Sequence, residues 1–287
     1  MLISSHQLKI QKVNNSVKAK PFVKWVGGKT QLLPELTSRV PDRFSKYFEP
    51  FIGGGALFFA LQPEQSILID INEELINAYR VIKYKIEELI TDLKQHIYEK
   101  TYYYRIRNVD RQLNEYKLWS DVRRASRLIY LNKCCFNGLY RVNSRGEFNT
   151  PIGRYKNPKI VDETTLRACS QALQKTEIVN GSFVEVEERV SNNDFVYFDP
   201  PYAPLNATSN FTGYSQRGFN NQMQLELRDL CDCLDRKGVR FMLSNSNAPL
   251  ILDLYQNYKI EFVSATRAIN SKANKRGKIP EVLVTNY

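Results

Sequence analysis

The sequence has little histidine, cysteine or acidic charge, and it has no long apolar run. It contains two His and five Cys residues in 287 positions, and no two cysteines form a C-x-x-C pair. This inventory argues against a metal site and favours free thiols in a reducing cytoplasm. No apolar run approaches the roughly 20 residues that a membrane helix needs, so we expect no membrane partner. The basic N-terminal residues are followed by no apolar core, which argues against a secretory signal.

Acidic residues are outnumbered by basic ones, at 30 against 41, and the formal net charge is +11. Between Arg123 and Lys159 nine basic residues accompany a single acid, Glu147. A run of this kind often forms a solvated helix face. Here it also contains aromatic and amide side chains, a mixture that favours a nucleic-acid-binding surface. These side chains are Phe136, Tyr140, Phe148, Tyr155, Asn137, Asn143 and Asn149.

Apolar segments near the start of the chain predict a parallel sheet. Residues 46–51 are expected to be a strand that leads into the glycines at 53–55 and then into an apolar helix over 56–61. A strand over 66–70 follows, and this order of elements is typical of a βαβ unit. Further strands are expected over residues 22–25, 195–198, 239–244, 259–266 and 279–285.

The middle of the chain has a helical pattern, and we expect it to be an insertion. Apolar residues recur at helical spacing from Leu75 to Leu93, and Asn72 can act as the helix N-cap. Helices are expected to continue to about Cys135, followed by a turn-rich stretch to Pro158. The chain therefore divides into an α/β domain over residues 1–72 and 177–287 and a mainly helical insert over 73–176.

After the insert, two more helices are expected, over 222–237 and 248–256. Gly238 directly follows the first of them and suits the C′ position. The last two predicted strands are expected to form an antiparallel pair around a basic loop at 271–278. This pair completes the sheet.

The glycine turn predicts a site for a nucleoside cofactor. Glycines let a ligand approach the backbone closely, and the helix N-terminus that follows favours negative charge. Asp70 ends the next strand and can accept hydrogen bonds from ribose hydroxyls. The dinucleotide fingerprint needs a third glycine where Phe58 stands, so Gly53 and Asp70 do not indicate NAD. A tight turn followed by a helix cap is the alternative explanation.

The tetrapeptide Asp199-Pro200-Pro201-Tyr202 carries the clearest chemical signal. Two prolines stiffen the backbone after a buried strand, so the Asp199 carboxylate and the Pro200 carbonyl become fixed acceptors. An exocyclic amine of a nucleobase is a poor nucleophile because its lone pair is delocalised into the ring. Two acceptors on its N–H bonds localise that lone pair, and the carboxylate stabilises the positive charge that grows during attack. Tyr202 can stack on a base that has left the helix.

These motifs resemble those of the D12 class, or alpha group, of DNA adenine N6-methyltransferases, which use S-adenosylmethionine (SAM). The order of blocks agrees: residues 24–29, then 51–55, a large insert, and 199–202. Within the insert, residues 136–141, 146–149 and 151–156 resemble the recognition hairpin of the Dam methylases, most closely of the DpnM type. The resemblance covers Pro21 to Tyr287. It implies the Rossmann-like α/β sheet of SAM-dependent methyltransferases with a mainly helical target-recognition insert.

The resemblance also implies a role for each matched residue. Those expected to bind SAM are Trp25, Lys29, Gly53, Gly55, Asp70 and Asp199. Those expected to bind and activate adenine are Asp199, Pro200, Pro201 and Tyr202. Those expected to contact double-stranded DNA are Lys24, Phe136, Asn137, Leu139, Arg141, Pro151 and Arg154. Arg141 and Arg154 would equally suit phosphate contacts, and Phe136 replaces a tyrosine found in some relatives, which removes a phenolic hydrogen bond.

Together these observations predict a site-specific enzyme that transfers a methyl group from SAM to N6 of a flipped adenine, without a metal. The expected site, GATC, follows from the hairpin resemblance alone. An RNA adenine N6-methyltransferase and a DNA-binding regulator that has lost catalysis are the alternatives. The sequence leaves open a solitary Dam-like methylase or a member of a restriction–modification system, with an endonuclease acting on the same site.

Overall fold

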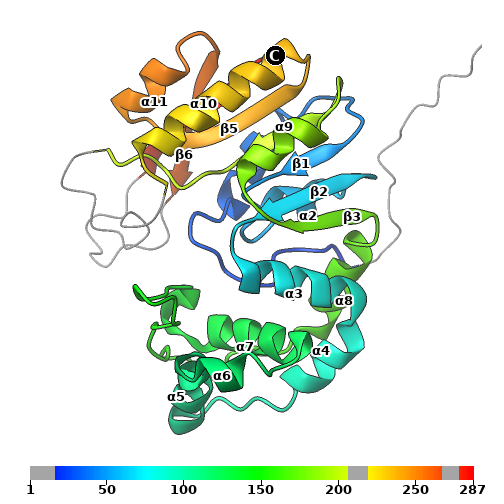
Figure 1. Ribbon diagram of the computed structural model, residues 1–287, viewed down its shortest axis with the longest axis vertical. Coiled ribbons are helices and arrows are strands. Elements are labelled where there is room, and N and C mark those ends of the chain that lie inside the picture. The colour runs from blue at the N-terminus through cyan, green and yellow to red at the C-terminus, as the bar shows by residue number, and fades with distance from the viewer. Residues whose placement is uncertain (1–16, 206–218, 267–277) are drawn as a thin grey trace, which may run out of the picture.

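One seven-stranded sheet organises the computed structural model, which describes residues 17–205, 219–266 and 278–287 (Figure 1). The strand order is β3-β2-β1-β4-β5-β7-β6, and all pairings from β3 to β5 in that order are parallel. β7 runs antiparallel to its neighbours β5 and β6. This mixed α/β fold with a mostly parallel sheet confirms the predicted class. The strands are β1 (Tyr47–Glu49), β2 (Ser66–Asp70), β3 (Thr176–Asn180), β4 (Phe195–Phe198), β5 (Arg240–Ser246), β6 (Lys259–Thr266) and β7 (Lys278–Thr285).

Helices cover both faces of the sheet, and alternate strand residues therefore enter two different apolar clusters. Tyr47 packs in the cluster that contains Leu57 of α2, and the next residue, Phe48, packs in the cluster that contains Leu227 of α10. The helices on the first face are α1 (Leu33–Thr37), α2 (Ala56–Leu61) and α3 (Glu73–Tyr84). Those on the second face are α9 (Val186–Arg189), α10 (Asn221–Arg236) and α11 (Pro249–Leu254).

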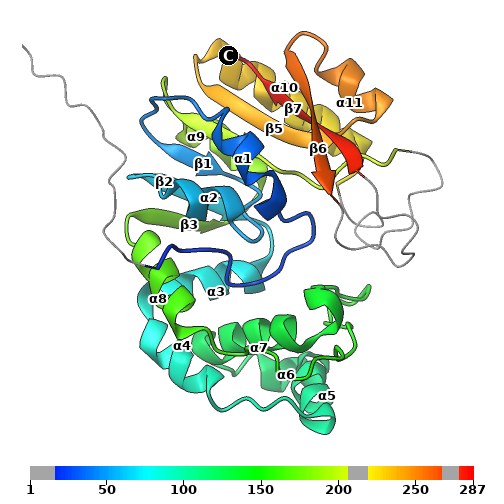
Figure 2. The same ribbon diagram turned by 180° about the vertical axis from the view of Figure 1, so that it is seen from behind.

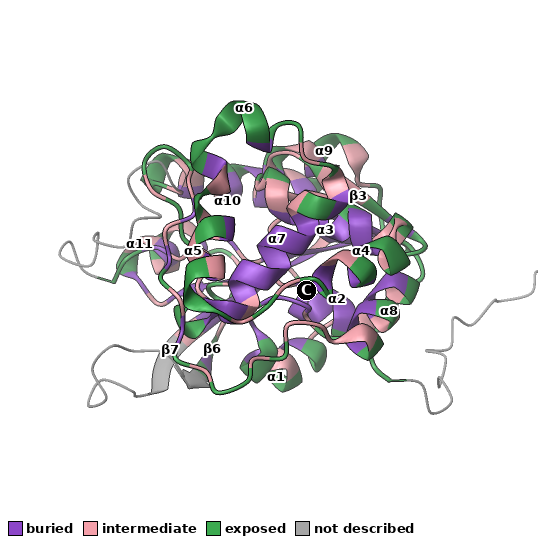
Figure 3. Ribbon diagram, turned by 90° about the horizontal axis from the view of Figure 1, so that it is seen from below, coloured by how far each residue is buried: buried purple, intermediate pink, exposed green. Residues whose placement is uncertain are grey.

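The remaining helices form a group beside the sheet, and within this group α8 lies next to α3 (Figure 2). α7 is the centre of this group, because it contacts α3, α4 and α5. Figure 3 shows α3 and α7 as largely buried, whereas α6 is mostly exposed at the outer surface. These helices are α4 (Ile86–Leu93), α5 (Lys100–Asn108), α6 (Leu113–Tyr116), α7 (Asp121–Cys134) and α8 (Glu163–Ala172).

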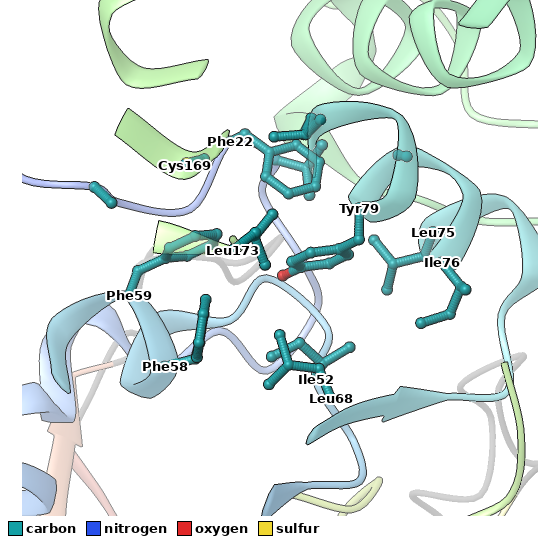
Figure 4. Packing of buried hydrophobic residues seen from close by; sticks show 14 of the residues in the cluster. Phe22, Ile52, Phe58, Phe59, Leu68, Leu75, Ile76, Tyr79, Cys169 and Leu173 are labelled. Atoms are coloured by element: carbon teal, nitrogen blue, oxygen red, sulfur yellow. The ribbon is translucent and has the colours of Figure 1, made fainter. Parts of the chain in front are cut away.

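Tyr79 of α3 joins three parts of the chain in one packed cluster (Figure 4). Its ring meets the edge of Phe22 at a centroid distance of 4.9 Å and stacks on Phe59 of α2 at 6.3 Å. Its hydroxyl donates a hydrogen bond to the Gly53 carbonyl at 3.0 Å. The N-terminal segment, the glycine turn and α3 are therefore fixed relative to one another.

The expected strand over residues 22–25 is wrong, because this segment pairs with no strand of the sheet. Phe22 and Val23 are buried against helices, which explains their apolar character. The Lys24 N–H donates to the side chain of Asn132 at 2.9 Å instead of to a neighbouring strand. A turn follows at once, in which the Gly28 N–H donates to the Trp25 carbonyl.

The other predicted elements are confirmed to within a few residues. Asn72 caps α3 by accepting the Leu75 N–H at 3.0 Å, and Gly238 follows α10 with a φ of +70°. β6 and β7 form the predicted antiparallel pair. Most of the basic loop expected at 271–278 lies outside the described residues, as do the N-terminal residues 1–16. No helix in the described ranges is long and apolar enough to cross a membrane.

Two basic residues of the stretch from Arg123 to Lys159 form ion pairs with acids of the protein itself. Arg124 contacts Glu73 at 2.7 Å and Glu74 at 2.6 Å. The buried Arg127 contacts the Asp110 carboxylate at 2.8 Å. Because both charges are paired within the protein, the prediction of a nucleic-acid surface rests on the other cations of the stretch.

We predict that Asp110→Ala destabilises the protein by about 3–5 kcal/mol, because it leaves Arg127 as an unpaired buried charge. It also removes the acceptor of the Phe148 N–H, which lies 2.7 Å from Asp110 Oδ2. Urea unfolding measures the loss. The control is Glu64→Gln, which breaks an exposed pair with Lys175 and should change stability by less than about 1 kcal/mol. Equal stabilities of the two variants would contradict the prediction.

Candidate active site

The loops after β1 and β4 meet at the centre of the sheet. β1 and β4 are parallel neighbours, with Tyr47 opposite Phe195. The chain order along the sheet reverses between them, since β2 and β3 lie on one side and β5 lies on the other. Ligands of open α/β sheets bind at the carboxyl ends of strands at such a reversal. The glycine turn and the Asp199–Tyr202 loop occupy that place.

Asp70 holds the glycine turn through its carboxylate. Oδ2 accepts the Gly53 N–H at 3.1 Å, and Oδ1 accepts the Asn72 N–H at 2.9 Å. Burial raises the pKa of Asp70, whereas these two hydrogen bonds act in the opposite direction. A carboxylate oxygen has two acceptor sites, so each oxygen retains one for a further donor.

Glycine is required at both ends of the turn. A Cβ on Gly53 would lie 2.8 Å from Cδ1 of Trp25, and one on Gly55 would lie 2.6 Å from Oη of Tyr79. Both glycines also have a positive φ, which L side chains rarely adopt. The Gly55 N–H closes a tight turn on the Ile52 carbonyl at 2.7 Å, so the simple turn explanation of these glycines also holds.

Trp25 connects the glycine turn to the turn-rich end of the insert. One side of its indole lies against Gly53, and the ring stacks on Tyr140 with 4.9 Å between centroids and 21° between planes. The two predicted sites, for cofactor and for DNA, therefore share a wall made by one aromatic pair.

Asp199 lies directly after β4 and contacts the buried Lys29. Lys29 Nζ lies 2.7 Å from Asp199 Oδ1 and donates a hydrogen bond to the Gly27 carbonyl at 2.6 Å. Burial raises the pKa of Asp199, Lys29 opposes this rise, and the negative charge of Glu281 adds to it. Lys29, which the resemblance assigns to SAM, is thus a direct partner of Asp199.

A buried amide network holds the loop that follows Asp199. Gln224 Nε2 donates to the Pro201 carbonyl at 3.1 Å, and Asn245 Nδ2 donates to Gln224 Oε1 at 3.2 Å. The Ala203 N–H donates to Asn245 Oδ1 at 3.0 Å, and Ser246 Oγ donates to the Ala203 carbonyl at 2.6 Å. The sequence analysis missed these residues, although polar residues at the end of the apolar strand β5 are a usable signal.

Two further acids near Asp199 were also missed. Tyr202 Oη donates a hydrogen bond to Glu281 Oε2 of β7 at 2.6 Å. Glu49 at the end of β1 accepts the Tyr47 hydroxyl at 2.6 Å, and burial raises its pKa to about 8. The loop thus lies near two carboxyl groups, which come from β1 and β7.

The turn-rich end of the insert forms a short hairpin. Antiparallel bridges pair Cys135 with Ile152 and Val142 with Phe148. Asn137 has a φ of +58°, and this left-handed turn leaves its side chain exposed.

The structure brings the expected DNA-contacting residues to this hairpin. Phe136 is 52% exposed, and Pro151 and Arg154 are also exposed, whereas Leu139 is half-buried. The Arg141 guanidinium is exposed and donates to Asn149 Oδ1 at 2.6 Å.

Lys24 joins the hairpin from the N-terminal segment. Its alkyl chain crosses Gly138, where a Cβ would lie 2.6 Å from Lys24 Cδ. Asn132 holds both chain segments of this contact, because its Nδ2 donates to the Lys24 carbonyl at 2.8 Å and to the Gly138 carbonyl at 3.0 Å.

The sequence of this chain is similar to those of known proteins. The model of the family "D12 class N6 adenine-specific DNA methyltransferase" matches residues 25–269. The type II methyltransferase M1.LlaDCHI of Lactococcus lactis subsp. cremoris is 48% identical over 277 residues, which cover 95% of this chain and 97% of the relative. The type II methyltransferase M.MjaIII of Methanocaldococcus jannaschii is 44% identical and covers 94% of this chain and 100% of its own length. The DNA adenine methylase of Escherichia coli K12 is 34% identical, with coverage of 93% and 95%.

We predict that Lys29→Met moves the acid limb of the pH–rate profile of methyl transfer to higher pH. In its expected role, only the ionised Asp199 can stabilise the positive charge that grows on the target amine, so activity should fall as the pH falls through its pKa, which burial already raises. The variant loses the ammonium that opposes this rise, while Glu281 and the loop tyrosine remain.

The measurement is single-turnover methyl transfer to duplex DNA over a range of pH. Lys175→Met, which removes a charge from an exposed pair, is the control and should leave the acid limb in place. An unchanged limb in the Lys29 variant, or a shift to lower pH, would contradict the prediction.

Proposed function

The chain belongs to the D12 class of N6 adenine-specific DNA methyltransferases, and from that premise we propose that it methylates the adenine of GATC in duplex DNA. The family uses SAM as methyl donor. The RNA-directed enzyme and the inactive regulator are therefore set aside. The observation that carries the proposal is the position of Asp199, a largely buried carboxylate at the end of β4 beside the glycine turn of β1.

The glycine turn fits the adenosyl part of SAM. Asp70 retains acceptor sites for ribose hydroxyls. Gly53 and Gly55 allow the turn that Asp70 holds, because a Cβ at either position would collide with Trp25 or Tyr79. Trp25 and Lys29 border the same space. SAM supplies, when bound, a methyl group on a positively charged sulfur.

Asp199 and the Pro200 carbonyl would accept the two N–H bonds of the target amine. Because the amide network fixes the loop, these acceptors are in place before the base arrives, and no reorganisation is needed during the reaction. Tyr202 would stack on the flipped base. Pro201 would keep the Tyr202 ring next to the Asp199 carboxylate.

The hairpin would determine the sequence that is methylated. Arg141 and Arg154 can each contact a guanine edge with two hydrogen bonds, and Leu139 and Pro151 can contact thymine methyl groups. Asn137 would bond to the orphaned base, with Phe136 beside it as an apolar wedge. Lys24 would add a base or phosphate contact from the N-terminal segment.

We also propose a division of the chain into two domains and a cellular setting for the enzyme. Residues 1–72 and 177–287 would form the SAM-binding catalytic domain, and residues 73–176 would recognise DNA. The enzyme would act in the cytoplasm without a metal, either alone or beside a restriction endonuclease that cleaves the same site when it is unmethylated.

We predict that plasmid DNA methylated by the protein carries N6-methyladenine in GATC, and that Arg141→Ala relaxes this choice. Loss of two hydrogen bonds to one base costs about 1–3 kcal/mol of discrimination at that position. Sequencing the methylated DNA at base resolution reports the base, its position and its context together.

The matched control is Arg145→Ala, an exposed cation at the tip of the same hairpin whose guanidinium pairs with no described residue. It should weaken binding to all sequences alike and keep the specificity. If Arg141→Ala behaves in the same way, the arginine contacts phosphate only. Methylation of another sequence by the unmodified protein would refute GATC.

A further inference from the structure

Glu281 reaches the active-site loop from a strand far away in the sequence. β7 pairs with β5, and this register places Glu281 opposite Ser246, a member of the amide network. The Glu281 carboxylate accepts the Tyr202 hydroxyl at 2.6 Å. Within the described ranges no basic side chain forms an ion pair with Glu281, so Tyr202 is its one assigned side-chain partner.

Tyr202 is restrained from three directions. Its hydroxyl is bound to Glu281, its ring centroid lies 4.6 Å from Lys29 Nζ, and the carbonyl of the preceding Pro201 is bound by Gln224. A tyrosine ring has few rotatable bonds, so these contacts define both its position and its tilt. The Lys29 contact also shows that the face of this ring accepts a positive charge.

We propose that Glu281 is a positioning residue for methyl transfer, which acts through its hydrogen bond to Tyr202. This inference rests on the proposed role of Tyr202 as the residue that stacks on the target adenine. The carboxylate holds the ring in the plane that the base meets, and it makes the ring face more electron-rich, because a phenol that donates to an anion gains electron density.

The attraction between the Tyr202 ring and the adenine should be strongest when the adenine becomes positively charged. The amine nitrogen acquires positive charge as it forms its bond to the methyl carbon, and this charge spreads into the base ring. An electron-rich aromatic face attracts that charge more strongly than it attracts the neutral base. Removing the Glu281 charge should therefore lower the rate of the chemical step more than it weakens DNA binding.

The experiment is a double-mutant cycle with Glu281→Gln and Tyr202→Phe, measured by single-turnover methyl transfer with saturating SAM and duplex DNA. Glutamine retains the shape and an acceptor oxygen but removes the charge. We expect Glu281→Gln to slow the reaction about tenfold, the scale of a hydrogen bond to a charged group, with KM for DNA changed less than twofold. In the Tyr202→Phe background the same change should have less than a twofold effect, because the hydrogen bond is already absent.

The matched control is Glu261→Gln on the adjacent strand β6, where the acid pairs with Arg39 at 3.2 Å. It removes one negative charge from the strand next to β7 without touching Tyr202, and the rate should not change. If Glu281→Gln does not fold, Tyr202→Phe alone still tests the bond and should slow the reaction by the same factor.

Two results would overturn the inference. One is a Glu281→Gln or Tyr202→Phe enzyme as fast as the unmodified protein. The other is an equal loss from Glu281→Gln in both backgrounds, which would mean that Glu281 acts by another route. An Asp199→Ala enzyme measured in parallel separates this failure from failure of the proposed chemistry, because the latter requires that variant to remain active.

Discussion

The site depends on keeping the Asp199 carboxylate ionised in a place that is largely closed to water. Burial alone raises the pKa of Asp199 and so favours the protonated acid, and the negative charge of Glu281 raises it further. Lys29 provides the compensating charge at 2.7 Å, and it is itself fixed by the Gly27 carbonyl. The Gly27 carbonyl, the loop after β4 and Glu281 of β7 therefore all affect the charge of Asp199.

The aromatic pair of Trp25 and Tyr140 links the glycine turn to the hairpin. Trp25 contacts both Gly53 and Tyr140, so the glycine turn and the hairpin meet at one indole. Arg127 and Asp110 then hold the far strand of the hairpin to the helical group. The glycine turn and the hairpin are therefore joined through this aromatic pair.

The sequence predicts the local structure best where a candidate residue lies beside a strand end or a turn. The glycines at 53–55 and the Asp199–Tyr202 loop each follow a predicted strand within a few positions, and Asp70 is the last residue of one. The segment at 22–25 was assigned wrongly because apolar residues buried by helices have the same composition as a short strand. Gln224, Asn245 and Glu281 were missed because only the packing of α10 and the register of β5 with β7 bring them to the loop.

The most direct test of the central claim is methyl transfer from radiolabelled SAM to a GATC duplex by the Asp199→Ala protein. The account predicts a loss of at least about 100-fold in the single-turnover rate, since the carboxylate is a preorganised electrostatic group. Thermal unfolding of the same sample establishes that the protein is folded. A folded variant that transfers methyl groups within a few-fold of the unmodified rate would contradict the account.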